Sequence, residues 1–409
     1  MKFLVGYPVR VDEDVPFIEI LAELQEHIEE VYFAWPGEPS GRSAMGNRAG
    51  KTDASVREHL ECDLAAIKAM GIKLDLLFNA NCYGGLATSN SLAQTVYAVV
   101  DHLAGTTGLD AVTTTSPFIA DLLKHRYPGL EVRASVNMRI GTVPAMEYVK
   151  DIFDGFYMQR EFNRDFARIE ELFGWCRLNG KKLFLLANSG CLNFCSSQTF
   201  HDNLVAHEAQ IIETDNMPGQ VLACQMHLSK PNNHSAILQG SWIRPEDLDQ
   251  YASYFPFVKL ATRMHFNPSL VLRAYVNRRY QGNLLDLLEP GYHALFKNEI
   301  IDNSSFPPDW FSRVTQCLNK CHTCDYCSKV YITVKKNIGN DPKVGETRGV
   351  YRFGDSAPTP RDLSLLAIWP GNQRQFHTST GIQYAHDDRH LVPEGRKKDS
   401  PWRKPGESL

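Results

Sequence analysis

The sequence lacks a long apolar run. No stretch of about 18 uninterrupted apolar residues, the length that a membrane-spanning helix needs, occurs among its 409 residues. The apolar run after Met1 is too short for a secretory signal, because Arg10 and Asp12 follow it closely. We therefore expect a cytoplasmic protein without membrane insertion.

The sequence also lacks an excess of charge of one sign. Its 43 Lys and Arg residues face 47 Asp and Glu residues, a net charge of −4, so no global basic field would attract nucleic acid. The motifs GxSxG, HExxH and Walker A are absent, so hydrolytic and nucleotide-driven chemistry lack their usual markers. A chain with 43% apolar and 22% charged residues still predicts a folded protein with a substantial core.

Short β-branched or apolar runs alternate with amphipathic stretches of helical length up to about residue 285, which is typical of βα units around a parallel sheet. Eight strands are predicted, at Phe3–Tyr7, Val31–Trp35, Leu74–Phe78, Ala111–Thr115, Val132–Val136, Gly155–Met158, Leu183–Ala187 and Val258–Ala261. This number of units favours an α/β fold of the (β/α)8 TIM-like barrel type. An open doubly wound sheet is less favoured, since no glycine-rich phosphate-binding turn follows the first strand.

Two of the expected helices carry specific signals. One buried helical stripe is predicted from apolar residues that repeat at intervals of three and four, namely Phe162, Phe166, Ile169, Phe173 and Cys176. Asn267 before Pro268 combines a capping side chain with proline at the first helical position. This pair predicts a helix over Ser269–Tyr280.

The seventh βα unit is too long for a simple barrel. Nearly sixty residues separate the strand ending at Ala187 from the helix expected to open at Pro245, and a loop of this length on a barrel is usually functional. We therefore predict a barrel over residues 1–285 with a long insertion after strand seven, and a Cys-rich metal-binding appendage over residues 286–335. Residues 336–409 are expected to form a largely extended or disordered tail, with one segment that docks at Leu363–Trp369.

The ten cysteines indicate metal ligands or redox groups, because cytosolic thiols stay reduced. Four of them, Cys317, Cys321, Cys324 and Cys327, fall within eleven residues and resemble the compact runs that hold a 4Fe–4S cluster. Structural zinc is the alternative, although zinc sites usually consist of two CxxC pairs separated by a longer loop. A radical-SAM site is disfavoured because the run follows the barrel and offers a fourth ligand.

A second group of cysteines is expected at the barrel mouth. Cys191 and Cys195 follow strand seven, and two thiols four residues apart can hold one edge of a cluster. Cys224, in the insertion, is predicted as a third ligand. Cys82, after strand three, is predicted as a fourth, because the C-terminal strand ends converge on one face. The helical Cys62 and Cys176, not counted in this group, are expected to be ordinary small apolar residues.

Polar residues gather at other strand ends. Arg42, Arg139 and Arg263 follow strands two, five and eight, and their guanidinium groups suit a small anionic substrate or co-substrate such as a carboxylate. Asn137 is predicted to bind substrate beside them. Helix capping and surface ion pairs at the rim are the alternative roles for these residues.

Five motifs occur in order over about residues 1–330: Ala134-Ser135-Val136-Asn137, the run from Gln159 to Phe166, Gly190-Cys191-Leu192 with Cys195, the run from Trp242 to Leu248, and Tyr275 with Tyr280, Gly282, Asn283 and Leu284. In this combination the chain resembles the U32 family of collagenase-like peptidases, and its C-terminal cysteine run is similar to one that closes a subset of that family. The resemblance implies a barrel, iron–sulfur binding through mouth cysteines, and kinship with oxygen-independent hydroxylases of RNA bases or ubiquinone precursors. Asn188 and the Cys191 to Cys195 spacing depart from the hydroxylase pattern at strand seven, so no substrate is carried over.

These features favour an iron–sulfur-dependent redox enzyme with one or two 4Fe–4S clusters, an oxygen-independent hydroxylase of a small molecule or a nucleic-acid base. Its candidate catalytic residues are Arg139, Glu161 and His207, and an electron-transfer partner or partner subunit is expected. The first alternative is a metal-dependent U32-type peptidase, in which His207 with Glu161 would accept the proton of a metal-activated water. The second is a non-catalytic iron–sulfur or zinc-binding assembly partner.

Replacing Cys324 with Ser should lower the metal content or the unfolding temperature, because a four-thiolate site would lose one ligand. Metal analysis and thermal unfolding of the purified variant measure the two effects, with Cys62→Ser as the control. An unchanged metal load together with an unchanged melting temperature would contradict the four-ligand assignment.

Overall fold

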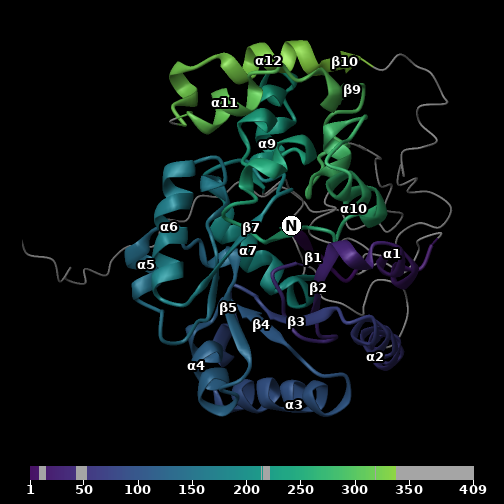
Figure 1. The fold of residues 1–409 in the computed structure, drawn as a ribbon, viewed down its shortest axis with the longest axis vertical. Coiled ribbons are helices and arrows are strands. Elements are labelled where there is room, and N and C mark those ends of the chain that lie inside the picture. The colour runs from purple at the N-terminus through teal and green to yellow at the C-terminus, as the bar shows by residue number, and fades with distance from the viewer. Residues whose placement is uncertain (9–14, 43–52, 213, 215–221, 318, 338–409) are drawn as a thin grey trace, which may run out of the picture. The chain divides into compact units, whose positions relative to one another are not determined.

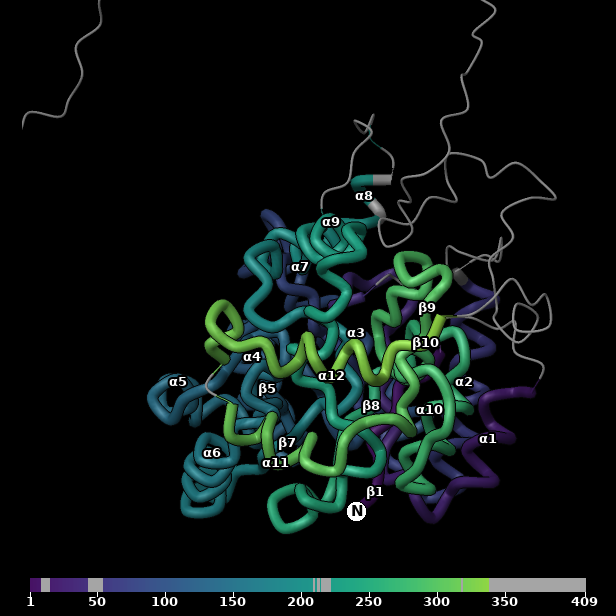
Figure 2. The backbone as a smooth tube through the Cα atoms, turned by 90° about the horizontal axis from the view of Figure 1, so that it is seen from above, coloured from purple at the N-terminus to yellow at the C-terminus, as the bar shows by residue number. Residues whose placement is uncertain are grey.

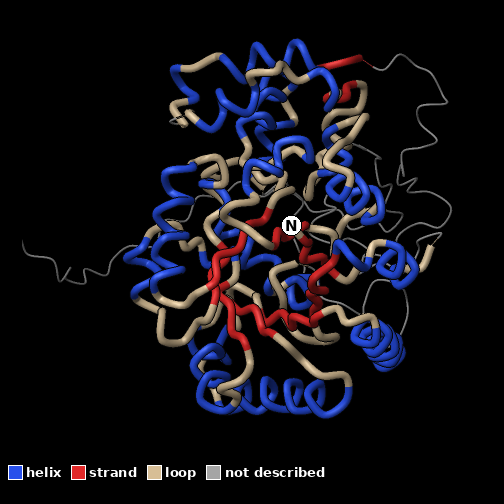
Figure 3. The backbone as a smooth tube through the Cα atoms, viewed as in Figure 1, coloured by secondary structure: helices blue, strands red, loops and turns tan. Residues whose placement is uncertain are grey.

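Eight parallel strands form a closed barrel in sequence order, and β1 pairs with both β2 and β8. The barrel strands, red in Figure 3, are β1 Lys2–Gly6, β2 Ile28–Ala34, β3 Lys73–Phe78, β4 Ala111–Thr114, β5 Glu131–Ala134, β6 Gly155–Tyr157, β7 Lys182–Leu186 and β8 Phe257–Leu260. Every strand predicted from the sequence is present, and its ends differ from the prediction by three residues at most. The predicted (β/α)8 TIM-like barrel is confirmed.

Helices surround this barrel (Figure 1): α1 Phe17–Glu23, α2 Asp53–Ala69, α3 Asn90–Thr106, α4 Pro117–Arg126, α5 Val143–Glu147, α6 Phe166–Leu178 and α10 Pro268–Val276. The insertion after β7 contains α7 Gln198–Ala206, α8 Glu208–Ile212, α9 Ala223–Leu228 and the 3-10 helices η5 Pro231–Gln239 and η6 Pro245–Tyr251. The chain after the barrel contains β9 Glu299–Ile301, α11 Trp310–Thr315, α12 Tyr326–Val334 and β10 Lys335–Asn337. The other 3-10 helices are η1 Gln25–His27, η2 Gly84–Leu86, η3 Val136–Met138, η4 Arg160–Phe162, η7 Leu284–Leu287, η8 Asn303–Ser305 and η9 Cys321–Thr323.

This computed structural model describes residues 1–8, 15–42, 53–212, 214, 222–317 and 319–337, all within one compact unit, Met1–Trp369. The predicted docking segment at Leu363–Trp369 lies outside the described residues. So does the predicted tail, except for residues 336 and 337. In the described part of the chain, no helix is both long and apolar enough to cross a membrane.

Local capping explains where the predicted helices begin and end. Asn267 caps α10 by accepting a hydrogen bond from Leu270 N at 2.9 Å, as predicted. The helix ends at Val276 and not at Tyr280, because Arg278 adopts a left-handed backbone conformation with φ of +54°. The helix expected to open at Pro245 is the 3-10 helix η6.

The predicted stripe from Phe162 to Cys176 is divided between two elements. Phe162 ends the 3-10 helix η4, and Asp165 then caps α6 by accepting a hydrogen bond from Arg168 N at 3.0 Å. Within α6, Ile169 and Cys176 are buried, as the spacing predicts. The stripe therefore runs along α6 alone, because the Asp165 cap sets the start of the helix.

Charged side chains occupy the barrel interior. Outward residues of the strands, such as Val31 and Phe33 on β2, pack in the main apolar cluster that includes surrounding-helix residues. The inward positions instead bury two acids, Glu30 and Asp75, and two bases, Arg133 and Lys259. The interior therefore combines these charged side chains with a small cluster of Leu4, Tyr157 and Phe184.

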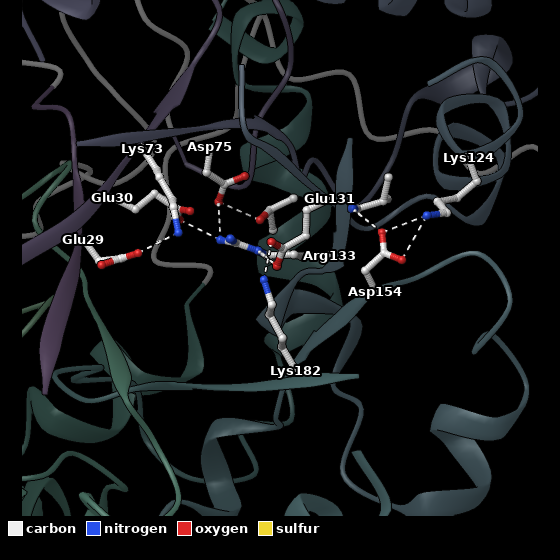
Figure 4. A network of polar contacts seen from close by, with 11 residues as sticks. Glu29, Glu30, Lys73, Asp75, Lys124, Glu131, Arg133, Asp154 and Lys182 are labelled. Carbon is white, nitrogen blue, oxygen red and sulfur yellow. Dashed lines mark hydrogen bonds and ion pairs between the residues drawn. The ribbon is translucent and has the colours of Figure 1, made fainter. Parts of the chain in front are cut away.

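Arg133 links the two buried acids (Figure 4). Its Nη1 atom lies 2.6 Å from Glu30 Oε1 and 3.9 Å from Asp75 Oδ2, and the Thr113 hydroxyl donates to Asp75 at 2.7 Å. The Lys259 ammonium lies 3.8 Å from the centre of the Tyr32 ring. Burial and the neighbouring Glu30 raise the pKa of Asp75 to about 7, whereas burial lowers the pKa of Lys259 to about 8. Burying the charged form of Asp75 or Lys259 costs free energy, so each charge is stable only while its oppositely charged partners stay beside it.

A second apolar cluster joins the insertion to the chain after the barrel. It contains Leu228, Ile237, Leu238 and Trp242 from the insertion, and Leu284, Phe296, Trp310, Val330 and Val334 from the later chain. The helices α9, α11 and α12 lie on the same side of the barrel, and α12 leads directly into β10 (Figures 1 and 2). We call this region, residues 223–242 together with 284–337, the cysteine lobe.

Replacing Arg133 with Met should lower the free energy of unfolding by about 3–5 kcal/mol, because Glu30 loses its ion-pair partner and Lys259 is left as the one buried cation for two buried carboxylates. Urea unfolding of wild type and variant measures this loss. Arg273→Met removes an arginine from an exposed ion pair with Glu23 and should change the unfolding midpoint far less. Equal effects of the two substitutions would contradict the importance of the interior network.

Candidate active site at the barrel mouth

The loop after β7 is fixed in place by Asn188. This buried side chain donates to Leu287 O at 2.9 Å and to Ala261 O at 3.1 Å, and accepts from Ala261 N at 2.6 Å. Gly190 N then donates to Glu289 O at 3.0 Å. Because a Cβ atom at Gly190 would overlap the Pro290 carbonyl, only glycine fits where Cys191 enters the mouth.

The structure brings Cys191, Cys195 and Cys224 together. Burial raises the pKa of the Cys224 thiol, and the charges of Cys191 and Cys195 raise it further. Tyr292, from the chain after the barrel, faces all three thiols, and its buried hydroxyl forms a hydrogen bond with the Cys224 thiol. In the described part of the chain, no group of three or more His, Cys, Asp or Glu side chains is already arranged around a common metal position.

A buried arginine accompanies these three thiols. Arg160, the first residue of η4 after β6, is only 6% exposed and donates to the side chain of Gln198. Burial by itself would lower the pKa of Arg160, but the charge of Cys191, followed by those of Glu161 and Asp202, raises it above the usual value. Arg160 is therefore a cation that a negatively charged group at Cys191 would neutralise.

Two of the three predicted arginines meet at the mouth. Arg263 is buried, and its Nη2 atom donates to Ser40 Oγ at 2.9 Å, whereas Nη1 has no partner. Burial, together with the charge of Arg42, lowers the pKa of Arg263 to about 10. Arg42 forms an ion pair with Glu289 at 3.6 Å. Asn137 contacts the loop that carries Arg42, since its amide nitrogen would lie 2.5 Å from a Cβ atom at Gly41.

His201 connects this arginine pair to Arg160. Burial lowers the pKa of His201, and so do the nearby charges of Arg42 and Arg160. The Nε2 atom of His201 is buried and has no hydrogen-bond partner, like Nη1 of Arg263. Several cations and unpaired nitrogen atoms thus share the mouth, which is the composition that an anion requires.

The structure brings together two of the three predicted catalytic residues, Arg139 and Glu161, but not His207. Arg139, in a left-handed conformation, lies 3.5 Å from the buried Glu161. His207 forms a side-chain hydrogen bond with Cys82 and is not paired with Glu161. Its Nδ1 atom lies 2.9 Å from Gln210 Oε1, and the Cys82 sulfur accepts from Gly84 N at 3.3 Å.

The C-terminal cysteines lie next to the mouth. Burial raises the pKa of Cys321, with added contributions from the charges of Cys317 and Cys324, and burial raises the pKa of Cys327 to about 11. One cavity of about 390 Å³ is lined by Cys195, Cys224 and Cys321 together. Residues from both predicted cysteine groups therefore line a common space.

Arg164 borders the C-terminal cysteines. Its guanidinium lies 4.5 Å from the Trp242 ring and 5.3 Å from the Trp310 ring, and it donates to Trp242 O at 2.7 Å. A second, small cavity is lined by Arg164, Cys317, Cys321 and Cys327. Each cysteine group thus has an arginine beside it, Arg160 for the first and Arg164 for the second.

Sequence reasoning did not single out Arg164 or Tyr292 as site residues. Arg160 follows a predicted strand, so its position at a strand end was a usable signal. Tyr292 belongs to a segment outside the predicted barrel and carries no local pattern that would place it at the mouth. Only the path of the chain back over the barrel brings it there.

Comparisons with known proteins give a sequence relative. No family model matches the chain. The chain is 26% identical over 273 residues to a protein named uncharacterized protease MJ1657 from Methanocaldococcus jannaschii, with 64% of this chain and 77% of that protein covered.

Among solved structures, the U32 peptidase Mk0906 has a TM-score of 0.45 at 15% identity, covering 64% of this chain and 92% of that one. An Oleispira antarctica phosphodiesterase has a TM-score of 0.34 at 12% identity, covering 52% and 96%.

The chain is thus a (β/α)8 barrel protein with thiols and arginines at its mouth. The sequence relative and the ordered motifs support the resemblance to the U32 peptidase family. The place of its C-terminal cysteine run within a subset of that family stays a prediction.

Replacing Gly190 with Ala should lower the free energy of unfolding by about 1–3 kcal/mol, because the new methyl group displaces backbone at Pro290. Gly174→Ala is the matched control, since a Cβ atom in the middle of α6 meets nothing within 4 Å. It should stabilise the protein by about 0.5–1 kcal/mol. Urea unfolding distinguishes the two, and an unaltered midpoint for Gly190→Ala would contradict the tight fit of the Cys191 loop.

Proposed function

We propose that the protein is an iron–sulfur-dependent redox enzyme with a 4Fe–4S cluster held by Cys191, Cys195 and Cys224. The carrying observation is the meeting of these three thiols beside the buried Arg160. Among its neighbours, Cys191 raises the pKa of the buried Arg160 most, and thiolates bound to a cluster would keep negative charge at that position. The donor set is therefore suited to a cluster. When bound, the cluster supplies one-electron chemistry.

Three protein thiols leave one position of such a cluster for another ligand. Cys82 stays a predicted fourth ligand from the sequence, but its hydrogen-bond partners are His207 and Gly84 N. The proposal therefore rests on three cysteines. Tyr292 covers them and limits the access of water, since its hydroxyl is buried against the thiols.

A small anion is the proposed substrate or co-substrate. Arg263 offers an unpaired Nη1 atom, and Arg42 and His201 lie on the same side of the mouth. A carboxylate or phosphate oxygen would satisfy these nitrogen atoms and offset the repulsion between the two guanidinium groups. In this arrangement Arg42 and Arg263 bind and orient the anion, whereas Arg139 holds Glu161.

The C-terminal cysteines are proposed to hold a second cluster, with zinc as the alternative group. Four thiols within eleven residues can satisfy either. The shared cavity favours a cluster, because Cys321 reaches the space lined by Cys195 and Cys224. A second cluster in this place would pass electrons between the mouth and an electron-transfer partner.

A peptidase is the second candidate function, favoured by the name of the sequence relative. A metal-dependent mechanism needs a metal-bound water with a base in reach. The structure places His207 with Cys82 and Glu161 with Arg139, so these residues do not form such a site as they stand. Metal-dependent cleavage of a peptide library by the pure protein, abolished in Cys191→Ala, would support the peptidase over the redox enzyme.

Anaerobic purification with iron, sulfide and zinc measured per chain tests the proposal. We expect at least about four irons and four sulfides per chain, with broad absorbance near about 400 nm. Cys191→Ser should lower both contents, whereas Cys62→Ser, at an exposed thiol on α2, should not. Stoichiometric zinc without sulfide would overturn the iron–sulfur assignment.

A further inference from the structure

Arg164 is a cation whose hydrogen-bond partners are all neutral. It lies just before the residue that caps α6, and its Nε and Nη2 atoms donate to Trp242 O at 3.2 and 2.7 Å. Its Nη1 atom donates to Leu238 O at 3.2 Å. The nearby Asp247 forms its own ion pair with Arg244 at 3.7 Å, and no carboxylate in the described part of the chain forms one with Arg164.

Two tryptophan rings hold this guanidinium in place. It lies 4.5 Å from the centre of the Trp242 ring and 5.3 Å from that of the Trp310 ring. Both rings are fully buried, and they stack with their centres 5.8 Å apart. Trp310 also stacks on Tyr326, the residue before Cys327. The charge of Arg164 therefore has a fixed position beside the segment that carries Cys327.

Cys327 is the thiol that shares a contact with this cation. Leu238 O accepts a hydrogen bond from Arg164 Nη1 at 3.2 Å and another from the Cys327 thiol at 3.9 Å. The guanidinium and the sulfur thus meet at the same oxygen atom. One small cavity is lined by Arg164 together with Cys317, Cys321 and Cys327. Three of the four C-terminal cysteines therefore border one space with a fixed cation.

The electrostatic effects between Arg164 and Cys327 are reciprocal. Burial raises the pKa of the Cys327 thiol to about 11, and the charge of Arg164 is the largest influence that opposes this rise. Burial lowers the pKa of Arg164, whereas the charges of Tyr251 and Cys327 raise it. A guanidinium stays protonated at neutral pH even in such surroundings. Arg164 therefore favours negative charge at Cys327.

We propose that Arg164 sets the reduction potential of a second cluster held by Cys317, Cys321, Cys324 and Cys327. This inference rests on the second cluster of the proposed function. When such a cluster takes one electron from a one-electron reductant, its negative charge grows by one unit, and no bond forms or breaks. A fixed cation beside Cys327 stabilises the reduced form more than the oxidised form, so it raises the potential. Arg164 acts through Cys327 and is a positioning residue.

A purely structural role is the competing explanation, because Arg164 also holds the Leu238 and Trp242 carbonyls through hydrogen bonds. Two substitutions separate the roles. Arg164→Lys keeps a positive charge but loses the planar fork, whereas Arg164→Gln loses the charge and keeps an amide donor. The potential follows the charge if Arg164 acts electrostatically. A structural role would change stability without that pattern.

Redox titration of the full chain, purified anaerobically and followed by electron paramagnetic resonance, tests the inference. The signal of the second cluster is the one that Cys324→Ser removes. Arg164→Met and Arg164→Gln should shift its midpoint to more negative potential, so that the reduced fraction at the wild-type midpoint falls several-fold. Arg164→Lys should stay close to wild type. Arg313→Met, which removes an exposed arginine over the Tyr326 ring, should have a much smaller effect because water screens its charge.

Two results would overturn this inference and leave the second cluster in place. One is an unchanged midpoint in an Arg164→Met or Arg164→Gln variant that keeps its iron and sulfide. The other is a shift in Arg164→Lys as large as that in Arg164→Met, because the charge would then not be the cause.

Zinc at the C-terminal cysteines, or the absence of a signal that depends on Cys324, would overturn the second cluster and the inference with it. If Arg164→Met loses the cluster, Arg164→Gln decides. If both variants lose it while Arg164→Lys does too, Arg164 is a structural residue and the proposal fails.

Discussion

The contact of Arg133 with Glu30 and Asp75 inside the barrel is the interaction on which the rest of the structure depends. Four ionisable side chains point into the ring of strands, where water cannot solvate them, and two acids balance two bases. They come from β2, β3, β5 and β8, so the network connects strands on different sides of the barrel. The loops at the mouth keep their mutual positions only while these strands stay closed.

The second constraint is the joining of the insertion to the chain after the barrel. The loop that begins at Asn188 is hydrogen-bonded to Leu287 and Glu289, and the two segments share the apolar core of the cysteine lobe. This packing carries Tyr292 over the mouth thiols and brings Cys321 into the cavity lined by Cys195 and Cys224. The late cysteines are therefore part of the surroundings of the mouth, although they follow the barrel in sequence.

The surroundings of the mouth thiols differ more than the thiols themselves. Cys191 faces Arg160, a permanent cation that can balance a fixed negative group. Cys82 faces His207, whose charge changes near neutral pH and which can give and take a proton. Resemblance to a family named for peptidases thus coexists with mouth thiols for which we propose a redox cluster.

The sequence alone determined the barrel, its eight strands, the Asn267 cap and the grouping of the cysteines, because these depend on periodicities and spacings between residues close in the chain. It placed Arg42, Arg263 and Asn137 correctly at one mouth, since strand ends of a barrel must converge. The partners of the individual side chains were decided by tertiary structure. Arg139 meets Glu161, His207 meets Cys82, and Arg160 takes the place beside Cys191, because these contacts depend on the paths of loops that no local pattern encodes.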